Sequence, residues 1–252
     1  MAGVFRRRRL PHWDVADATY FVTACLEGSI PTHGLESIRE YRRELDARSC
    51  PPAMTPPEWE HHKHKLVFAK IDKLLDGDPV VRHLEQPWLA SEVRTSLYHF
   101  AGTRYHLLAY VVMPSHLHWV FHPIPKWCES LSRRAGFQPA RHSAKSRQAG
   151  SLHYGGRRPK QRTPREVIMH SIKSFTGNCC NKLLGSDNEF WQAESYDHWV
   201  RDDDELLRII DYVEQNPVVA GLCETPEAFA FSSARDRAAW GIPHGQPLVP
   251  PK

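Results

Sequence analysis

The chain has 252 residues, of which 41% are hydrophobic, with 33 Lys and Arg against 29 Asp and Glu. This composition excludes a fibrous or wholly disordered protein and predicts a globular chain with one sizeable core. No stretch approaches the ~18 uncharged apolar residues that a membrane span needs, and no apolar segment of a signal peptide follows the basic N-terminus. We therefore expect a cytoplasmic protein without a membrane partner.

The cysteines and the charge distribution narrow the protein class further. The six cysteines include no C-x-x-C pair, which excludes a zinc ribbon or redox dithiol and suits a reducing compartment. Residues 131–165 hold ten Lys or Arg and no acid, so the rest of the chain is net acidic. Overall basicity therefore says little about nucleic-acid binding by the core.

Composition divides the chain into one predicted domain with three flanking or inserted segments. The segment 131–165 is rich in Gly, Ser, Pro, Gln and Arg, which predicts a disordered basic insertion. It is either a tolerated surface insertion or a segment that trails over a polyanion. Residues 15–240 form the domain that it interrupts, 1–14 a flexible basic arm, and 241–252 a Pro-rich tail that frays from Pro243.

The first half of the domain reads as a strand followed by helices. Residues 19–26 are β-branched and aromatic and predict a strand, and apolar residues at helical spacing predict helices over 33–48 and 57–76. His61 and His64 lie one turn apart in the second helix. No acid or cysteine completes a metal set nearby, so a solvated helix face is the simpler interpretation, with a metal site as the alternative.

The second half contains a predicted hairpin, three predicted helices and one stretch without a clear assignment. A helix is expected over 91–104 with Ser91 as N-cap, followed by a hairpin whose strands are separated by residues 113–115. Helices are also predicted over 166–185 and 202–222. The second of these should finish near Asn216, because Pro217 disfavours the α conformation of the residue before it. The stretch 190–201 has no clear assignment.

Two histidines in the second hairpin strand share one face. His116 and His118 are two apart, whereas Leu117 and Trp119 point to the opposite face. Two imidazoles on one face can hold a metal, although half-exposed polar residues are the commoner explanation of such a pair.

Tyr212 and Asn216 are four residues apart in the predicted helix 202–222 and can face the same way. If this face packs toward the histidine strand, two imidazoles, an amide and a phenol meet. Such a donor set leaves positions for water or phosphate oxygens and suits Mg²⁺ or Mn²⁺. A tyrosinate attacking phosphorus beside the metal would form a phosphotyrosine. A lone helix tyrosine is more often a core or rim residue, so spacing alone indicates only a metal-dependent site.

The motifs resemble those of one family of enzymes. The run AYVVMPSHLHWVF resembles the His-hydrophobic-His (HUH) motif of single-tyrosine transposases. The run WQAESYDHWVRDDDELLRIIDYVEQNPVVAGL is similar to the C-terminal half of REP-associated tyrosine transposases, and YFVTACLEGSIP to their first strand. The resemblance covers most of residues 15–235, without the insertion. The helical stretch 33–76 and the insertion both exceed the family's plan.

The resemblance implies a fold and a catalytic site. The fold would be α+β, a ferredoxin-like antiparallel sheet covered by helices with the HUH strand in a central place. His116 and His118 would be metal ligands, Asn216 the third protein ligand, and Tyr212 the nucleophile that becomes linked to a DNA 5′-phosphate. Tyr196 is a rival nucleophile, but Tyr212 matches the family's position, and Tyr196 would pack or touch DNA.

The implied partner is single-stranded DNA, as hairpins from palindromic repeats, with the protein acting as a monomer or a homodimer. Phosphates could be contacted by the basic arm, and bases could stack on exposed aromatic rings. The residues concerned are Arg6, Arg7, Arg8 and Arg9 of the arm, and Trp191, Tyr196 and Trp199. A solubilising terminus and core aromatics are the alternatives.

Three functions remain open from the sequence. The first is a transposase that cleaves and rejoins DNA through phosphotyrosine. The second is a binding module derived from such an enzyme, which clamps hairpins without cleaving them. The third is a metal-dependent phosphohydrolase that uses water and keeps the histidines but does not depend on Tyr212.

Overall fold

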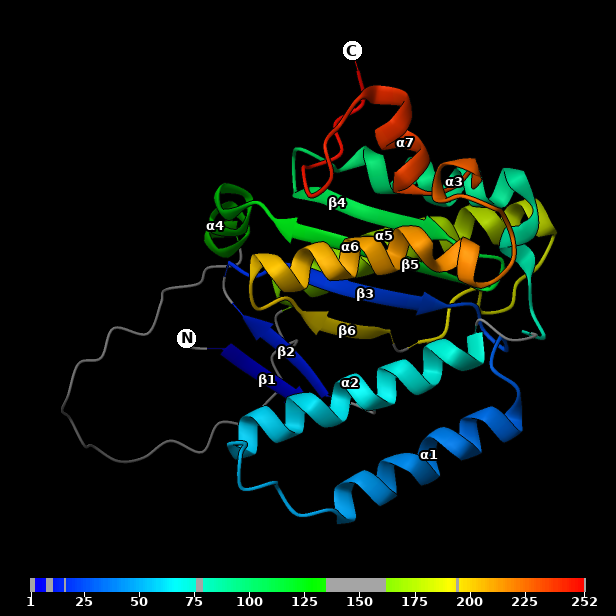
Figure 1. Cartoon of the computed structure of the whole chain (residues 1–252). Coiled ribbons are helices and arrows are strands. Elements are labelled where there is room, and N and C mark those ends of the chain that lie inside the picture. Colours follow the sequence, from blue (N-terminus) through cyan, green and yellow to red (C-terminus); the bar gives the residue numbers. More distant parts are fainter. Residues whose placement is uncertain are drawn as a thin grey trace, which may run out of the picture.

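Four antiparallel strands in a βαββαβ connection form the central sheet of the protein. The computed structural model describes residues 3–7, 11–15, 17–75, 79–134, 162–193 and 195–251. The six elements are β3 Tyr20–Cys25, α3 Pro87–His99, β4 Tyr105–Val112, β5 His116–Pro123, α5 Pro164–Leu184 and β6 Tyr196–Trp199. The strand order is β4-β5-β3-β6, with every neighbouring pair antiparallel (Figure 1). This connectivity is ferredoxin-like, so the predicted α+β class is confirmed.

The predicted hairpin of β4 and β5 places the histidine strand inside the sheet. A hydrogen bond from the Met113 N–H to the His116 carbonyl (2.9 Å) closes its turn. β5 pairs with β3 on its other side, so both of its edges are bonded. Because side chains alternate along a strand, His116 and His118 point to one face of the sheet. Leu117 and Trp119 point to the other face and join the main core there.

Helices α3 and α5 cover the face that carries Leu117 and Trp119. Helix α5 ends as predicted at Gly185, which adopts the left-handed conformation of a C-cap. The predicted start of α3 at Ser91 was wrong. Pro87 begins the helix four residues earlier, because its missing N–H is not needed in the first turn.

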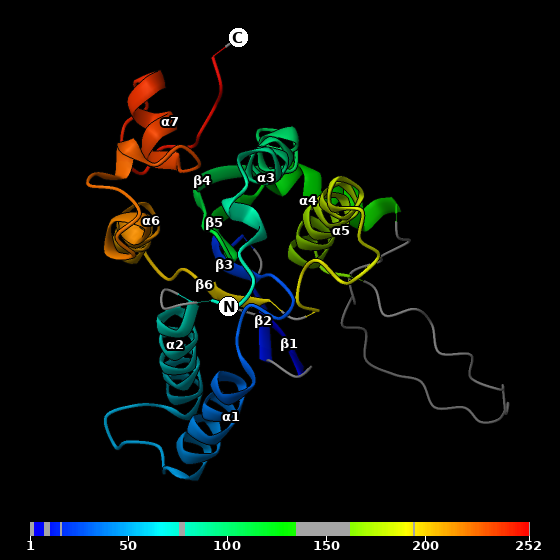
Figure 2. The ribbon, with the colours of Figure 1, turned by 90° about the vertical axis from the view of Figure 1, so that its right-hand side faces the viewer.

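The opposite face of the sheet is covered by helices that do not belong to the βαββαβ unit. These are α6 Asp203–Val219 and α2 Pro56–Leu75, and α1 Thr32–Ala47 packs against α2. Figure 2 shows α3 and α5 on one side of the sheet, α6 on the other, and α1 and α2 below. Among the helices that the structure describes, none is long and apolar enough to cross a membrane.

Helix α6 runs past the point at which the sequence predicts its end. Asp202 caps its N-terminus, as the acidic start suggests, but Pro217 lies inside the helix. The proline removes one donor only. The Ala220 N–H still bonds to the Asn216 carbonyl (3.0 Å), and the Leu222 N–H bonds to the Pro217 carbonyl (2.8 Å). The predicted end near Asn216 was wrong because these bonds complete the last turn.

The two ends of the chain are more ordered than the sequence predicts. Within the expected flexible arm 1–14, β1 Gly3–Arg7 pairs antiparallel with β2 Pro11–Val15 in a separate two-stranded sheet. Near the C-terminus, Leu248 is buried and its N–H donates to the Leu107 carbonyl (2.7 Å). The predicted fraying from Pro243 was wrong, because one apolar residue of the Pro-rich tail reaches the core.

Both ends of the predicted insertion 131–165 belong to helices. Its first residues lie in α4 Pro125–Arg134. At its other end, α5 starts after Thr163, whose hydroxyl accepts from the Glu166 N–H while the Glu166 carboxylate accepts from the Thr163 N–H. This capping box extends the helix into the polar segment. Residues 135–161, on which the rest of the prediction falls, lie outside the described residues.

A buried ion pair between Arg165 of α5 and Asp197 of β6 (3.1 Å) generates a stability prediction, because both side chains are at most 3% exposed. Removing one partner leaves the other charge buried, so Asp197→Asn should lower the free energy of unfolding by about 3–5 kcal/mol. Glu129→Gln removes the exposed pair with Arg133 on α4 (3.3 Å) and should cost less than about 0.5 kcal/mol. Urea denaturation measures both, and equal losses would contradict the prediction.

Candidate metal and nucleophile site

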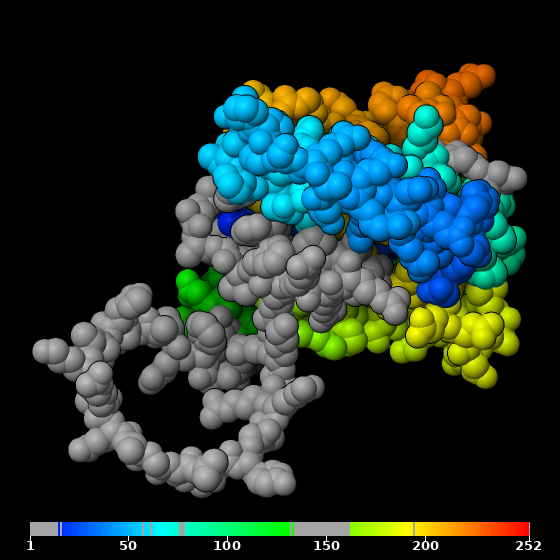
Figure 3. Space-filling model, turned by 90° about the horizontal axis from the view of Figure 1, so that it is seen from below, coloured from blue at the N-terminus to red at the C-terminus, as the bar shows by residue number. Residues whose placement is uncertain are grey.

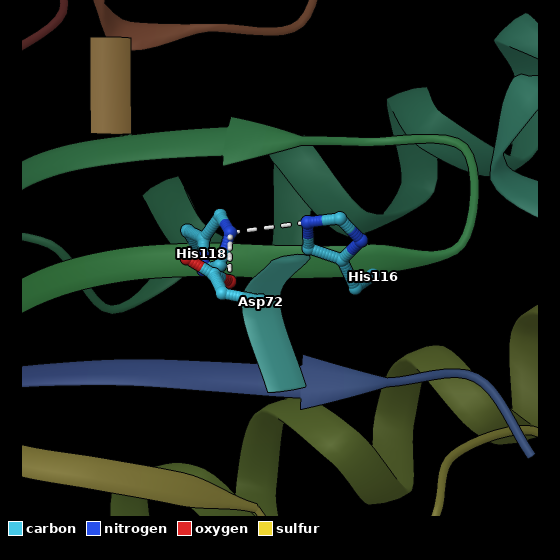
Figure 4. A group of neighbouring side chains, drawn as sticks. All are labelled: Asp72, His116 and His118. Atoms are coloured by element: carbon cyan, nitrogen blue, oxygen red, sulfur yellow. Dashed lines mark hydrogen bonds and ion pairs between the residues drawn. The ribbon is translucent and has the colours of Figure 1, made fainter. Parts of the chain in front are cut away.

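The two histidines of β5 face each other in the interior of the protein. His116 and His118 are 1% and 0% exposed, and their Nε2 atoms are 3.0 Å apart (Figure 4). Atoms this close can both bind one ion.

Hydroxyl groups hold the other nitrogen of each ring. The Thr23 Oγ1 lies 2.6 Å from the His118 Nδ1, and the Ser115 Oγ lies 3.0 Å from the His116 Nδ1. Thr23 reaches His118 because the antiparallel register of β3 and β5 sets the two residues opposite each other. With each Nδ1–H donating to its hydroxyl, both Nε2 atoms present lone pairs, the arrangement typical of metal-binding histidines.

Helix α2 brings a carboxylate to the histidine pair. The Asp72 Oδ1 lies 3.3 Å from the His118 Nε2, and the Asp72 side chain is 7% exposed. One ligand atom from each of Asp72, His116 and His118 lies within 4.8 Å of the others, so this group can hold a metal ion. In Figure 4, Asp72 projects from its own helix toward the strand.

Sequence reasoning missed Asp72. Asp72 lies two turns further along α2 than His64, outside the immediate surroundings of the His61–His64 pair. The available signal was helical spacing. Asp72 is four residues after Phe68 and three before Leu75, so a charged residue interrupts the apolar stripe of the helix. The side chain of His61 lies outside the described residues.

Burial keeps both imidazoles in the form that binds metals. It lowers the pKa of His116 to about 3, and it lowers the pKa of His118 well below its ordinary value, with a further contribution from the charge of His116. Both rings are therefore neutral near pH 7, and a cation does not have to compete with protons for them.

Tyr212 of α6 lies beside this group, and Asn216 follows it one turn further along the helix. The Tyr212 ring centroid is 6.0 Å from that of His118 and 6.0 Å from that of Phe21, and the residue is 38% exposed. The Asn216 Nδ2 donates to the Tyr212 hydroxyl (3.3 Å). The structure thus brings Tyr212 next to the histidine pair, with Asn216 bonded to the phenol.

The amide of Asn216 tests whether a cation suits the site. Asn216 is 2% exposed, and among the described residues its Oδ1 has no hydrogen-bond partner. A buried oxygen left in this way costs free energy, which a cation ligated by that oxygen would recover. Imidazole, carboxylate and amide donors together suit Mn²⁺ or Mg²⁺. The residues present therefore fit a divalent metal.

Two groups of polar contacts fix α6 over the sheet. At its N-terminal end, Glu205 accepts from the Arg201 N–H (2.8 Å), from His198 of β6 (3.2 Å) and from Lys65 of α2. These contacts hold the pKa of Glu205 well below its ordinary value although burial opposes this. Further along, the buried Glu214 accepts from α7 Ser233–Trp240. Its donors are the Ser233 Oγ (2.6 Å) and the Arg237 Nε (2.9 Å).

The residues predicted to contact DNA lie in different environments. Trp191 is buried, and its indole N–H donates to the Thr176 Oγ1 (2.8 Å), so the predicted stacking role was wrong because the ring belongs to the core. Tyr196 is half-buried against Phe68, with ring centroids 6.5 Å apart. Arg6 and Arg7 lie in β1 with side chains outside the description, and Arg8 and Arg9 lie outside the described residues.

The lowered pKa of His116 predicts a pH dependence of stability. Unfolding returns the imidazole to its ordinary pKa near 6.5, so the unfolded state binds more protons between about pH 6.5 and 3. Without metal, the free energy of unfolding should fall as the pH decreases through this window, by about 1.4 kcal/mol per pH unit at most from this group. Denaturation in EDTA at several pH values should show a smaller slope for His116→Asn. An unchanged slope would refute the assignment.

The chain has no match among protein-family models and none among curated proteins. It aligns with a solved structure described as "Structure of the REP associates tyrosine transposase bound to a REP hairpin". The two share 14% sequence identity and a TM-score of 0.38, and the alignment covers 92% of this chain and 86% of the other. At these values the alignment decides neither family nor activity, and the fold rests on the connectivity described above.

Proposed function

We propose that this protein is a metal-dependent enzyme that cleaves and rejoins single-stranded DNA, with Tyr212 as the nucleophile. The observation that carries the proposal is the position of Tyr212, whose ring lies 6.0 Å from that of His118. A partly exposed phenol beside a buried group of metal donors combines a nucleophile with charge stabilisation.

The cation would be held by His116, His118 and Asp72, with the Asn216 Oδ1 as a further donor, and when bound it would polarise the scissile phosphodiester. The Tyr212 phenol gives up its proton as its oxygen attacks phosphorus, the bond from phosphorus to the 3′ oxygen breaks, and the leaving 3′ oxygen takes up a proton. A 5′-phosphotyrosine results. Attack by a 3′-hydroxyl reverses the step and releases Tyr212, so no ATP is needed.

Asn216 would position the nucleophile in this reaction. Its Nδ2 donates to the Tyr212 hydroxyl, and it lies one helical turn further along α6. A donor at the phenol oxygen favours the ionised form over the protonated one. Asn216 can thus serve two roles, with its nitrogen toward the tyrosine and its oxygen toward the cation.

The substrate class in this proposal is a DNA hairpin from a palindromic repeat. It comes from the resemblance of the sequence motifs to REP-associated tyrosine transposases. The arm with Arg6 to Arg9 would contact phosphates, and Tyr196 of β6, at the edge of the sheet next to α2, would touch the strand.

One observation favours a second function, a phosphohydrolase that uses water. Asp72 completes a three-residue donor group without any residue of α6. Such a site can activate water, and Tyr212 would then be dispensable. The two functions differ in whether a covalent protein–DNA adduct forms.

The test incubates the protein with end-labelled single-stranded hairpins of palindromic repeats and Mn²⁺, followed by a denaturing gel. We expect labelled DNA at the protein's mass, complete loss of this band in Tyr212→Phe and in EDTA, and its retention in Tyr196→Phe. Cleavage that persists in Tyr212→Phe would establish the hydrolase. Hairpin binding without any cleavage would establish the binding module.

A further inference from the structure

We propose that the helical pair α1–α2 is a metal-coupled part of the active site. In this proposal Asp72 is an anionic ligand of the same cation as His116 and His118, so that cation binding and the docking of α2 against the sheet stabilise each other. The inference rests on the proposed function in taking the histidine pair as cation ligands. It goes beyond it in assigning a role to helices that the catalytic chemistry alone does not require.

The position of Asp72 in its helix is unusual for a packing residue. Ile71 and Leu75, its neighbours on the inward side, are 0% and 2% exposed and pack with Cys25 and Ile30. Burying a carboxylate in such surroundings costs free energy that nearby donors or cations offset. The Asp72 Oδ1 lies 3.3 Å from the His118 Nε2, and the carboxylate and the two imidazoles lie close enough to share one cation.

Apolar contacts hold α2 so that Asp72 points at the histidines. The Phe68 ring, one turn before Asp72, lies 5.0 Å from the Phe21 ring of β3 and 6.5 Å from that of Tyr196 of β6. The Phe21 ring lies in turn 5.6 Å from the His118 ring. The same side of α2 therefore carries both the packing residue and the carboxylate, and a cation would add a third point of attachment.

Helix α2 also contacts the helix that carries the nucleophile. Lys65 forms an ion pair with Glu205 in the first turn of α6. Seen from below, α1 and α2 lie side by side with the surface of α6 next to them (Figure 3). A cation bound by Asp72 and the histidines would consequently connect β5 and α2, and through Lys65 the start of α6.

The coupling has a measurable consequence, because two events that stabilise each other do so by the same factor. Mn²⁺ should slow hydrogen exchange of the α2 amides over 66–75, while the amides of α4, which is remote from the site, should be unaffected. Loss of the Asp72 carboxylate should remove this protection and weaken Mn²⁺ binding. A reduction of about tenfold to a hundredfold is expected, since even outer-shell groups of metal sites contribute that much.

The experiment compares the full chain, Asp72→Asn and Asp46→Asn, by Mn²⁺ titration calorimetry and by hydrogen exchange with and without Mn²⁺. Asp46 is the matched control, because it is an acid of the same helical pair that binds Lys63 (2.8 Å) on an exposed side. We expect weaker Mn²⁺ binding and no α2 protection in Asp72→Asn, and wild-type behaviour in Asp46→Asn. Wild-type Mn²⁺ affinity in a folded Asp72→Asn protein would overturn the inference, as would the absence of α2 protection in the unmodified chain.

These outcomes separate the inference from the proposed function. Asp72-dependent Mn²⁺ binding without any Tyr212–DNA adduct would retain the inference and remove the strand-transfer function. An adduct that forms equally well, at equal Mn²⁺ concentrations, in Asp72→Asn would retain the function and remove the inference. Circular dichroism of Asp72→Asn establishes that the variant folds, and the exchange measurement on the unmodified chain does not depend on any variant.

Discussion

The antiparallel register between β3 and β5 is the constraint on which the site depends. It sets Thr23 opposite His118 and Cys25 opposite His116. A slip of one residue would turn both histidines into the core beneath α3 and α5 and bring Leu117 and Trp119 to the other face. The apolar residues of β5 and the polar ones therefore specify the same register. The short contact from Thr23 to His118 (2.6 Å) is available only in that register.

Covering the second face of the sheet changes the chemistry of the histidines. The face opposite α3 and α5 is closed here by α6 and α2, which leaves His116 and His118 at most 1% exposed. Water that would otherwise solvate them is excluded, and the same exclusion lowers the pKa of both. The burial that makes a protonated pair unfavourable leaves a neutral pair of imidazoles, which is the form a cation binds. Burial and metal competence thus have one cause.

The features that follow from a local residue pattern, such as alternation or helical spacing, were predictable from the sequence. The features that depend on contacts between distant segments were not. Alternation in β5 and helical spacing in α6 give the histidine pair and the Tyr212–Asn216 pair, and the hairpin turn at 113–115 follows from local residues. Asp72 could not be joined to the histidines from sequence, because 44 and 46 residues separate them. The burial of Trp191 and Leu248 likewise depends on contacts with Thr176 and Leu107 that no local pattern encodes. Two helix boundaries were predicted wrongly for a different reason. Ser91 is a favourable N-cap residue, but the helix already begins at Pro87. Pro217 disfavours a helix before it, but the hydrogen bonds of the last turn of α6 continue the helix past it.

The exposure of each site residue orders the site from inside to outside. His116, His118 and Asn216 are at most 2% exposed and Asp72 5%, whereas Tyr212 is 38% exposed. In the proposed reaction, a phosphodiester that approaches from solvent would meet the exposed phenol before the deeper donors. If a cation is held by those donors, the space between it and Tyr212 is where a phosphate can touch both. In the proposed reaction, this ordering would place the side-chain nucleophile nearest the incoming phosphate, so the position of α6 would affect which nucleophile attacks. Glu205 at the start of the helix and Glu214 near its end are tied to α2, β6 and α7. These contacts hold α6 in place, with the phenol of Tyr212 partly exposed and the donors beneath it buried.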